Sequence, residues 1–333
     1  MKNLKKVLSL VLALAMALSL MTAAFAADAS DYKDYSKVTY KEAVDVMTAA
    51  GIFNGGDGNN FNPDATLNRE QAAKIITYML VGQEKADKLT TTVAPYADVA
   101  ATRWSAGSIA YCTNEGIIAG DGNGRFNPTA PVLGTQFAKM LLVALGYDPQ
   151  IEQLVGNSWA INTSKLALGD ADLDNGMEEI SLSDNLTREQ AAQMAYNAMK
   201  ATLVEYEDKG GDIIIGDITI NNGATKATPV TSKVKAESTN ISAEKTTDGL
   251  WTVEFAEKYC KDLKVTANDT DAFERPVTVW TLKAEKIGSY ANTPDLTYTK
   301  AVKASDIYKD LALGSTIDKK DVTVYINGEK AED

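Results

Sequence analysis

One short motif occurs three times in this chain, and it limits the possible folds more than any other feature does. The stretch LNREQAAKIITYML at residues 67–80 returns as LTREQAAQMAYNAM at residues 186–199, and VLGTQFAKMLLVAL at residues 132–145 is an altered copy. Apolar residues recur at helical spacing in all three, so each copy predicts an amphipathic helix. Internal repetition of this kind is typical of folds assembled from several copies of one small unit.

Two of the three helices begin with the same capping signal. Asn68 and Thr187 are good N-cap residues, and Gln71 and Gln190 follow three positions later. This spacing predicts a capping box, in which the cap side chain and the glutamine side chain each bind the other residue's backbone N–H. The first helical residue is therefore fixed in both copies.

An arginine, Arg69 or Arg188, stands at that first helical position. A helix N-terminus carries partial positive charge, so an acidic residue would be the stabilising choice there. Free backbone N–H groups and a guanidinium together form a good receptor for a carboxylate or a phosphate. The pattern thus predicts a site for an anion. The alternative is that each arginine pairs with the acid beside it, Glu70 or Glu189, and is otherwise solvated.

Each of these helices follows a loop and a shorter leading helix. The loops GIFNGGDGNNFNP at residues 51–63 and GIIAGDGNGRFNP at residues 116–128 match without a gap and are dense in Gly, Asn and Asp, which indicates tight, structured loops. A third unit begins near Trp159, and its loop, GDADLDNGMEEISLSDN, departs from the other two. One helix-loop-helix unit cannot bury its apolar face alone, so three must pack together.

The combination of G-I-x-x-G-D-G-x-x-F-x-P with a following (T/N)-R-E-Q-A-A resembles the S-layer homology domain. The resemblance covers residues 35–204 and implies repeats at 35–83, 95–148 and 156–206, the last with a degenerate loop. It further implies a multidomain chain that opens with an all-α pseudo-trimer, a three-pronged helical spindle.

In function, the resemblance implies non-covalent anchoring to the pyruvylated secondary polymer of a Gram-positive cell wall. In the family, the arginine of a T-R-A-E motif contacts the pyruvyl carboxylate in grooves between neighbouring repeats. The resemblance therefore implies that Arg69 and Arg188 each contact a carboxylate in such a groove. The residues expected to line the grooves beside them are the two caps, four loop residues and one tryptophan: Asn68, Thr187, Gly55, Asp57, Gly120, Asp121 and Trp104.

The altered copy departs from this pattern. Leu133, Gly134 and Thr135 stand where the cap, the arginine and the glutamate would be. The groove that this copy would serve is therefore expected to be weak or dead, and at most two full sites are supported.

The beginning of the chain and its charge indicate where the protein works. A basic start, an apolar run and Ala24-Phe25-Ala26 predict a secretory signal peptide over residues 1–26, with an uncleaved membrane anchor as the alternative. The apolar run is short for a full span, so no transmembrane span is expected after cleavage. With a net charge of −12, the chain is a poor candidate for binding nucleic acid.

Residue usage excludes several kinds of site. The chain contains no histidine, which excludes Ser-His-Asp and Cys-His catalysis and histidine-ligated metals. The two cysteines, Cys112 and Cys260, lie far apart and do not suggest a disulfide framework; Cys112 is expected to be buried on a helix.

One acidic loop is a candidate for calcium, and no other cofactor is expected. Asp170, Asp172 and Asp174, with Glu178 or Glu179, are spaced somewhat like a calcium-binding loop. The glycine is displaced to Gly176 and the twelfth position is Ser181 instead of glutamate, so a solvated acidic loop is the alternative.

The composition changes after Tyr206. Residues 207–211 are expected to be a linker, and residues 212–333 a β-rich or α+β domain that could continue beyond the end of this sequence. The segment AFERPVTVWTLKAEKIGSYANTPDLTYT is similar to modules that follow S-layer homology repeats in clostridial surface proteins and implies no activity. Trp251, Trp280 and Tyr290 could stack on sugars, although such aromatics are more often core or cross-strand pairs.

Three classes of function are consistent with the sequence. The leading hypothesis is a secreted, non-enzymatic module that binds the secondary cell wall polymer at the cell surface. The second is a wall-anchored enzyme acting on polysaccharides, with its catalytic part in residues 212–333 or beyond; acids are plentiful there, but no catalytic motif is evident. The third is a lattice protein whose repeats only self-associate.

Overall fold

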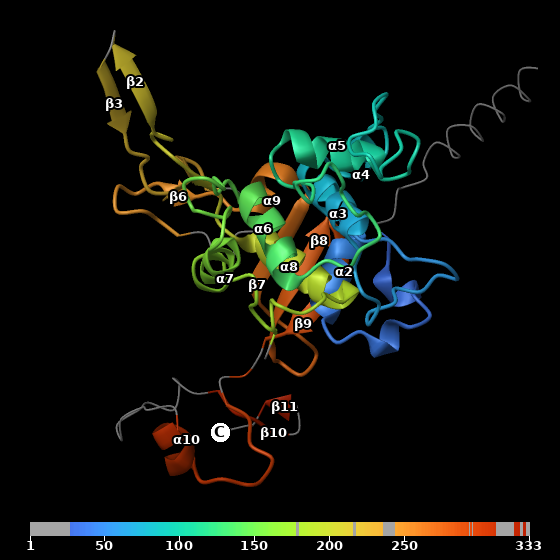
Figure 1. Cartoon of the computed structure of the whole chain (residues 1–333). Helices are drawn as coiled ribbons and strands as arrows, with labels where there is room; N and C mark the ends of the chain where they lie inside the picture. The colour runs from blue at the N-terminus through green and yellow to red at the C-terminus, as the bar shows by residue number, and fades with distance from the viewer. Residues whose placement is uncertain are drawn as a thin grey trace, which may run out of the picture.

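The computed structural model describes residues 27–177, 180–215, 218–235, 244–292, 294, 296–310, 323–326 and 329–330. The residues expected to form the signal peptide, 1–26, lie outside them. A helical region comes first and a strand-rich region follows, as the sequence predicts (Figure 1). Within the described residues, no helix has the length and apolar character needed to cross a bilayer.

Each repeat contributes a leading helix and a second helix. The leading helices are α2 (Lys41–Ala49), α5 (Ala106–Asn114) and α7 (Trp159–Gly169), and the second helices are α3 (Arg69–Val81), α6 (Gly134–Leu145) and α8 (Arg188–Lys200). Short helical segments η1 (Ala29–Asp31), η2 (Tyr35–Lys37) and α4 (Gln83–Ala86) complete the helical region. The first two leading helices stop where Gly51 and Gly116 adopt φ of 70° and 71°, a left-handed ending that glycine adopts without strain.

The three second helices begin from one small ring of backbone hydrogen bonds. The N–H of Leu67 donates to the carbonyl of Leu186 (2.8 Å), that of Val132 to Leu67 (3.0 Å), and that of Leu186 to Val132 (3.0 Å). Each of these residues immediately precedes the N-cap of its helix. The altered second copy therefore occupies a place in the fold equivalent to the two intact copies.

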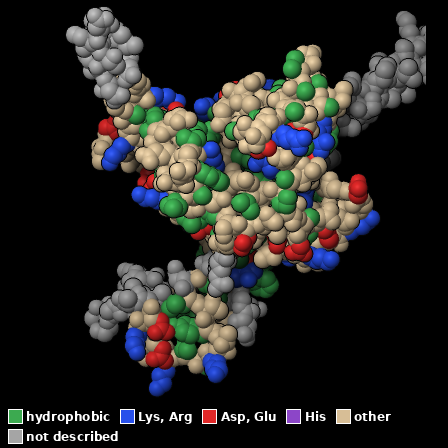
Figure 2. Space-filling view, viewed as in Figure 1, with side chains coloured by type: hydrophobic (Ala, Val, Ile, Leu, Met, Phe, Trp, Pro, Cys, Tyr) green, Lys and Arg blue, Asp and Glu red, His purple; other side chains and the backbone are tan. Residues whose placement is uncertain are grey.

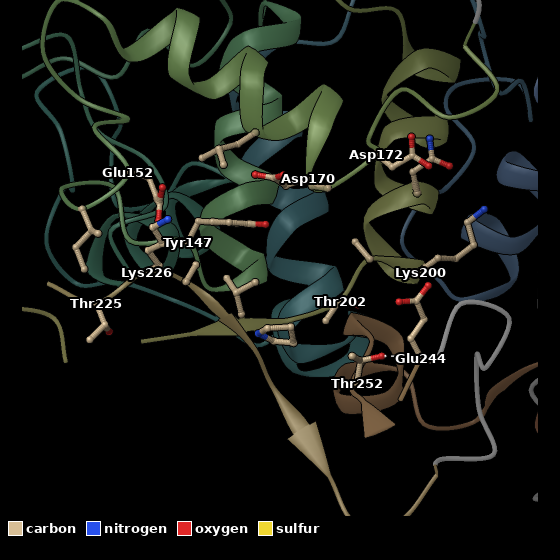
Figure 3. Close-up of a pocket in the computed structure, with 18 of the residues that line it drawn as sticks. Tyr147, Glu152, Asp170, Asp172, Lys200, Thr202, Thr225, Lys226, Glu244 and Thr252 are labelled. Carbon is tan, nitrogen blue, oxygen red and sulfur yellow. Dashed lines mark hydrogen bonds between the residues drawn. The ribbon is translucent and has the colours of Figure 1, made fainter. Parts of the chain in front are cut away.

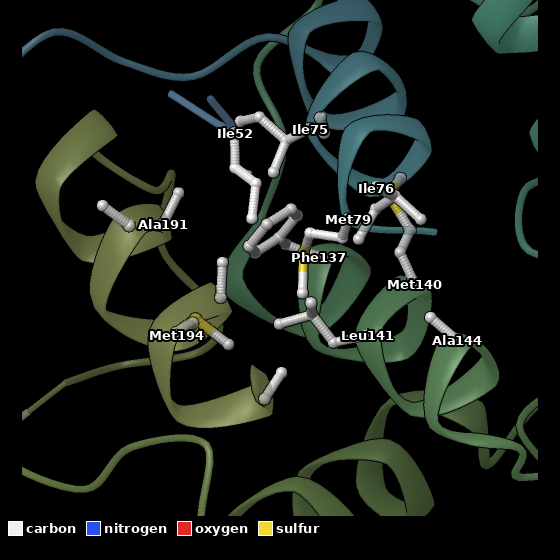
Figure 4. Packing of buried hydrophobic residues seen from close by; sticks show 14 of the residues in the cluster. Ile52, Ile75, Ile76, Met79, Phe137, Met140, Leu141, Ala144, Ala191 and Met194 are labelled. Carbon is white, nitrogen blue, oxygen red and sulfur yellow. The ribbon is translucent and has the colours of Figure 1, made fainter. Parts of the chain in front are cut away.

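The core lies where these helices meet (Figure 4). Phe137 of α6 is fully buried between side chains of α3 and α8, among them Ile76, Met79 and Met194. Cys112 of α5 is also buried, as the sequence predicts, and both cysteines are free. Because all three repeats contribute to one apolar cluster, no single repeat has a complete core of its own.

The strand-rich region consists of short antiparallel pairs and one larger sheet. The pairs are β1 (Val204–Glu205) with β4 (Thr228–Pro229), β2 (Gly211–Ile215) with β3 (Ile218–Asn222), β5 (Thr231–Ser232) with β6 (Trp251–Thr252), and β10 (Tyr325–Ile326) with β11 (Glu329–Lys330). Strands β7 (Leu263–Thr270), β8 (Pro276–Leu282) and β9 (Glu285–Ala291) form a three-stranded antiparallel meander. Two helices, α9 (Phe255–Tyr259) and α10 (Ala304–Asp310), accompany them.

This sheet shares a core with the helical repeats. Trp280 of β8 is 0% exposed, and its indole N–H donates to Oε1 of Glu42 in α2 (2.7 Å). The hydroxyl of Tyr290 in β9 donates to Oδ2 of Asp45, also in α2 (2.6 Å). The interpretation of Trp280 as a core residue is therefore confirmed, and the sugar-stacking alternative is wrong for it. Trp251 is half-buried, with the ammonium groups of Lys235 and Lys245 each 4.8 Å from its ring centroid.

The surface carries charges of both signs. On the face seen in Figure 2, lysine and arginine side chains are interspersed with aspartate and glutamate side chains. That face offers no continuous basic area of the kind that follows a nucleic-acid backbone.

Candidate functional site

Both predicted capping boxes are present. Asn68 Oδ1 accepts from the backbone N–H of Gln71 (2.9 Å), and Gln71 Oε1 accepts from the N–H of Asn68 (3.0 Å). Thr187 and Gln190 make the same reciprocal pair at 3.3 and 3.0 Å. The cap side chains thus act on the helix, and they fix the position of the arginine that follows.

Arg69 reaches from α3 of the first repeat onto the loop of the second. Its Nε donates to the carbonyl of Phe126 (2.8 Å) and its Nη2 to the carbonyl of Ala119 (3.1 Å). The guanidinium lies over the Phe126 ring, 4.6 Å from the centroid, a favourable cation–π contact. Two hydrogen bonds and one ring therefore hold the group in a single orientation.

Arg188 makes the same arrangement between the third repeat and the first. Its Nε donates to the carbonyl of Phe61 (2.8 Å) and its Nη2 to the carbonyl of Asn54 (3.0 Å). The guanidinium lies 5.1 Å from the Phe61 ring and 5.8 Å from the Phe53 ring. Each arginine consequently spans a boundary between two repeats.

The acids beside the arginines have other partners, so the alternative that each arginine pairs with its neighbouring acid is wrong. Glu70 is buried and accepts from Arg103 Nε and Nη2 (2.7 and 2.8 Å) and from the hydroxyl of Ser105 (2.6 Å). Glu189 accepts from the backbone N–H of Thr39 (2.8 Å). Both carboxylates therefore join neighbouring repeats and leave the arginines alone.

The two guanidinium groups are half-buried cations without an ion-pair partner among the described residues. Burial lowers the pKa of both Arg69 and Arg188, while nearby acids, Asp121 and Asp98 for Arg69 and Asp34 for Arg188, act in the opposite direction. Arginine nevertheless stays protonated at any physiological pH. Within the same described residues, Nη1 of each group has no hydrogen-bond partner, so a terminal nitrogen is left for a ligand.

Gly55 and Gly120, which the sequence predicts to line the grooves, have a packing role. A Cβ atom on Gly120 would lie 2.7 Å from Cε1 of Tyr96, and one on Gly55 would lie 2.6 Å from Cε1 of Tyr32. These tyrosines pack on the two loop phenylalanines, with ring centroids 5.5 and 5.7 Å apart. Glycine is needed because a tyrosine ring covers each loop at close range.

The structure gives different surroundings to Asp121, Asp57 and Trp104, which the sequence also predicts to line the grooves. Asp121 Oδ1 accepts from the backbone N–H groups of Asn123 (2.8 Å) and Arg125 (3.1 Å), and these bonds lower the pKa of its carboxyl. Asp57 lies exposed and accepts through its backbone carbonyl. Trp104 is 57% exposed and stands between the two residues that bind Glu70, which places it close to the start of α3.

A family model for the S-layer homology domain matches residues 31–73 and 95–138. This chain carries S-layer homology domains. The chain is 28% identical to the surface layer protein of Brevibacillus choshinensis over 64% of its length, 29% identical to the middle cell wall protein of Brevibacillus brevis over 63%, and 28% identical to a cell surface protein of Thermoanaerobacter kivui over 68%.

These matches identify a secreted cell-surface protein. They cover 18%, 19% and 28% of the respective relatives, so the chain spans less than a third of the length of each. The segment 31–73 that the family model matches contains Arg69, whereas Arg188 lies outside both matched segments.

Two residues that sequence reasoning missed hold the S-layer homology loops in place. Asp34 accepts from the backbone N–H groups of Phe61 and Asn62 (2.7 Å each), and Asp98 accepts from those of Phe126 and Asn127 (2.8 Å each). The two asparagines adopt φ of 57°, which asparagine tolerates better than most residues. The signal was a Tyr-x-Asp triplet, Y-K-D at 32–34 and Y-A-D at 96–98, shared by both repeats.

The second S-layer homology repeat has no space for an arginine at its helix start. A Cβ atom on Gly134 would lie 2.7 Å from Cα of Leu182, and the N–H of Gly134 donates to the carbonyl of Asp184 (3.0 Å). The N–H of Thr135 likewise donates to Leu182 (2.7 Å). The equivalent N–H groups of Arg69 and Arg188 also donate to a neighbouring loop, at Ala130 and Ala65, so the close approach of Leu182 to Gly134 is what distinguishes the second repeat.

The calcium hypothesis stays a prediction. In the part of the chain that the structure describes, no group of three or more acids, histidines or cysteines converges on a point that could hold a metal ion. Asp172 adopts φ of 48° and accepts from Asn175 Nδ2 (2.6 Å). The hypothesis also needs Glu178 or Glu179, which lie outside the described residues, and Asp170 and Asp174 alone do not decide it.

Proposed function

We propose that this chain anchors a surface protein to the cell wall by binding acidic groups of a wall polymer at Arg69 and Arg188. The observation that carries the proposal is the pair of half-buried guanidinium groups, each held by two backbone carbonyls and lacking a carboxylate among the described residues. The S-layer homology resemblance suggests a pyruvylated secondary polymer as the source of the carboxylate.

The geometry favours such a ligand for a physical reason. The cost of removing part of the water from each guanidinium is met when the protein folds, and the carbonyl contacts fix the orientation before any ligand arrives. A carboxylate that meets Nη1 would gain a charge-assisted hydrogen bond in a partly dry environment, where such bonds are strongest. The exposed indole of Trp104 offers an apolar surface for a sugar ring near Arg69.

We further propose that the three repeats form the three-pronged spindle of the family, with two working grooves. One lies between α3 and the second loop, and the other between α8 and the first loop. The third, beside Gly134, is closed by the packing of Leu182. The relatives are named for the cell surface and the cell wall, not for a reaction, which favours anchoring over an enzymatic role.

The test is a sedimentation assay on purified wall sacculi, with and without chemical removal of the non-peptidoglycan polymer. Wild type is compared with Arg69→Ala, Arg188→Ala and the double variant. Arg275→Ala, which removes an arginine paired with Asp271 in the strand-rich region, is the matched control for loss of one positive charge.

Binding is expected to fall in each single variant and to be lost in the double variant and on stripped walls, while the control binds as wild type does. Circular dichroism must show that the double variant keeps its helices. Undiminished binding by a folded double variant would refute the proposal. Retention on stripped walls would mean that the partner is peptidoglycan itself or another copy of the chain.

A further inference from the structure

A cavity of about 940 Å³ lies where the third repeat meets the strand-rich region (Figure 3). Its walls come from residues 147–152, from α7 and the residues that follow it, from the C-terminal end of α8 with residues 201–204, and from residues 224–229, 244 and 252. Lys200, the last residue of α8, lines it, whereas Arg188 is the first residue of the same helix. A helix of that length separates the two ends by about 18 Å, so the cavity is distinct from the arginine grooves.

Hydrogen-bond acceptors prevail among the charged groups that line this cavity. Four carboxylates take part, Glu152, Asp170, Asp172 and Glu244, against two ammonium groups. Figure 3 shows Glu152 and Asp170 on one side and Glu244 on the opposite side. Acceptors with a net negative charge therefore line the space from more than one direction.

Uncharged donors and apolar atoms complete the lining. Tyr147 is 7% exposed, and burial together with the charges of Asp170 and Glu152 raises the pKa of its phenol to about 12, so its hydroxyl stays protonated. The hydroxyls of Thr202 and Thr252 also line the space. Apolar surface is supplied by side chains of both regions: Leu166, Val204, Ala227 and Pro229.

The two lysines leave the lining with a net negative charge, because four carboxylates line the same cavity. The Nζ of Lys200 lies 4.3 Å from the centroid of the Tyr196 ring, and in Figure 3 the side chain extends away from Tyr147 and Asp170. Burial lowers the pKa of this amine. Lys226 is the only other lining cation among the described residues.

We propose that this cavity binds one unit of a glycan that carries hydroxyl or amino groups and no acidic group. Paired carboxylates and hydroxyls suit the vicinal hydroxyls of a sugar, while the apolar side chains suit the C–H face of its ring. The volume lies within the usual range for small-molecule sites, and such sites favour boundaries between structural units. An acidic sugar is disfavoured by the carboxylates, so this site and the arginine grooves select opposite charges.

The inference is independent of the proposed function, because it uses none of the residues assigned to wall-polymer binding. The two proposals can therefore be refuted separately. Loss of binding at the arginines would leave the cavity intact, and an empty cavity would leave the anchoring proposal as it stands.

The experiment is ligand-observed NMR on the full chain carrying Arg69→Ala and Arg188→Ala, which removes the two proposed carboxylate sites, with three sugars of the same ring size: glucosamine, N-acetylglucosamine and glucuronic acid. At least one of the first two is expected to give saturable binding, with glucuronic acid about tenfold weaker or more, since its carboxylate would meet the like charges of the lining. Equal or tighter binding of glucuronic acid would overturn the proposal, and so would the absence of saturable binding by both of the others.

Variants locate the binding. Asp170→Asn with Glu244→Gln keeps the shape of the cavity and removes two charges, and Thr252→Trp fills the space from β6. Each is expected to weaken binding at least about fivefold, the first because charged hydrogen bonds are lost and the second because the indole occupies the space that the sugar would take. Glu115→Gln, which changes an exposed acid on the edge of the second repeat, is expected to leave sugar binding unchanged. Unchanged binding in both cavity variants, each shown to be folded, would place the sugar elsewhere and refute the assignment.

Discussion

Replacing Trp280 with alanine should destabilise the helical repeats, although the residue lies in the strand-rich region. Its side chain is 0% exposed, packs on Tyr196 of α8 with ring centroids 5.6 Å apart, and donates to Glu42 of α2. Removing a buried tryptophan typically costs about 3–5 kcal/mol, because both the transfer energy and the resulting cavity contribute. A loss of that size is a large part of the stability of an average domain.

A second substitution separates packing from hydrogen bonding. Trp280→Phe keeps most of the buried area but removes the indole donor, so one bond to Glu42 Oε1 is lost while the bond from the Tyr196 hydroxyl (2.7 Å) remains. The expected cost is about 1–3 kcal/mol, the usual range for removing one partner of a buried hydrogen bond to a charged group. Trp104→Ala is the matched control, since that tryptophan is 57% exposed and its loss should change stability by less than about 0.5 kcal/mol.

The assay is urea unfolding followed by far-ultraviolet circular dichroism, which reports mainly on the helices. Wild type is expected to unfold with the helices and the sheet in one transition, because they share a core. Trp280→Ala should move that transition to lower urea. If the helical signal unfolds at the wild-type midpoint in Trp280→Ala, the sheet is an independent unit and the shared-core reasoning is wrong.

Three further predictions concern the repeats. Burial acts to raise the pKa of Glu70, but hydrogen bonds from Arg103 and Ser105 more than offset this effect, so the pKa is lowered in the folded protein. The Glu70 carboxylate should therefore stabilise the fold at pH values above its pKa in the unfolded chain, and this stabilisation should be lost as the pH falls through its pKa in the folded protein. Glu70→Gln should flatten that part of a plot of unfolding free energy against pH. Gly134→Arg should not create a third groove but should destabilise by about 1–3 kcal/mol, as overpacking does, in thermal unfolding; a stable variant with increased wall binding would contradict this. Asp98→Ala should weaken wall binding as Arg69→Ala does, because it releases the two backbone groups that hold the loop under Arg69, whereas Asp57→Ala should not; equal effects in the sedimentation assay would rule out the distinction.

The sequence predicts well those features that depend on neighbouring residues. The capping box of Asn68 and Gln71 spans three positions, and the helix endings at Gly51 and Gly116 depend on one backbone conformation each, so the motif alone identifies them. The same locality explains why the sequence alone places both arginines at helix starts.

Features that depend on distant partners could not be found in the same way. The bonds from Arg69 to Ala119 and Phe126 cross from one repeat to the next, and nothing near Arg69 in the sequence specifies a backbone carbonyl as its partner. The docking of Trp280 on Glu42 joins residues 238 positions apart, so the apolar and β-branched residues of β8 predicted a strand but not its packing partner. Burial against a helix and burial against another strand leave the same pattern.

The way the grooves are shared makes the three repeats unequal in what each one's loss would cost. The first repeat supplies Arg69 to one groove and the carbonyls of Asn54 and Phe61 to the other, so its deletion would abolish both at once. The second supplies only a loop, and its own helix start faces the boundary at Gly134, where Leu182 approaches closely. If both grooves bind the wall polymer as we propose, loss of the arginine motif in the middle repeat leaves two sites, whereas loss of the first repeat leaves none.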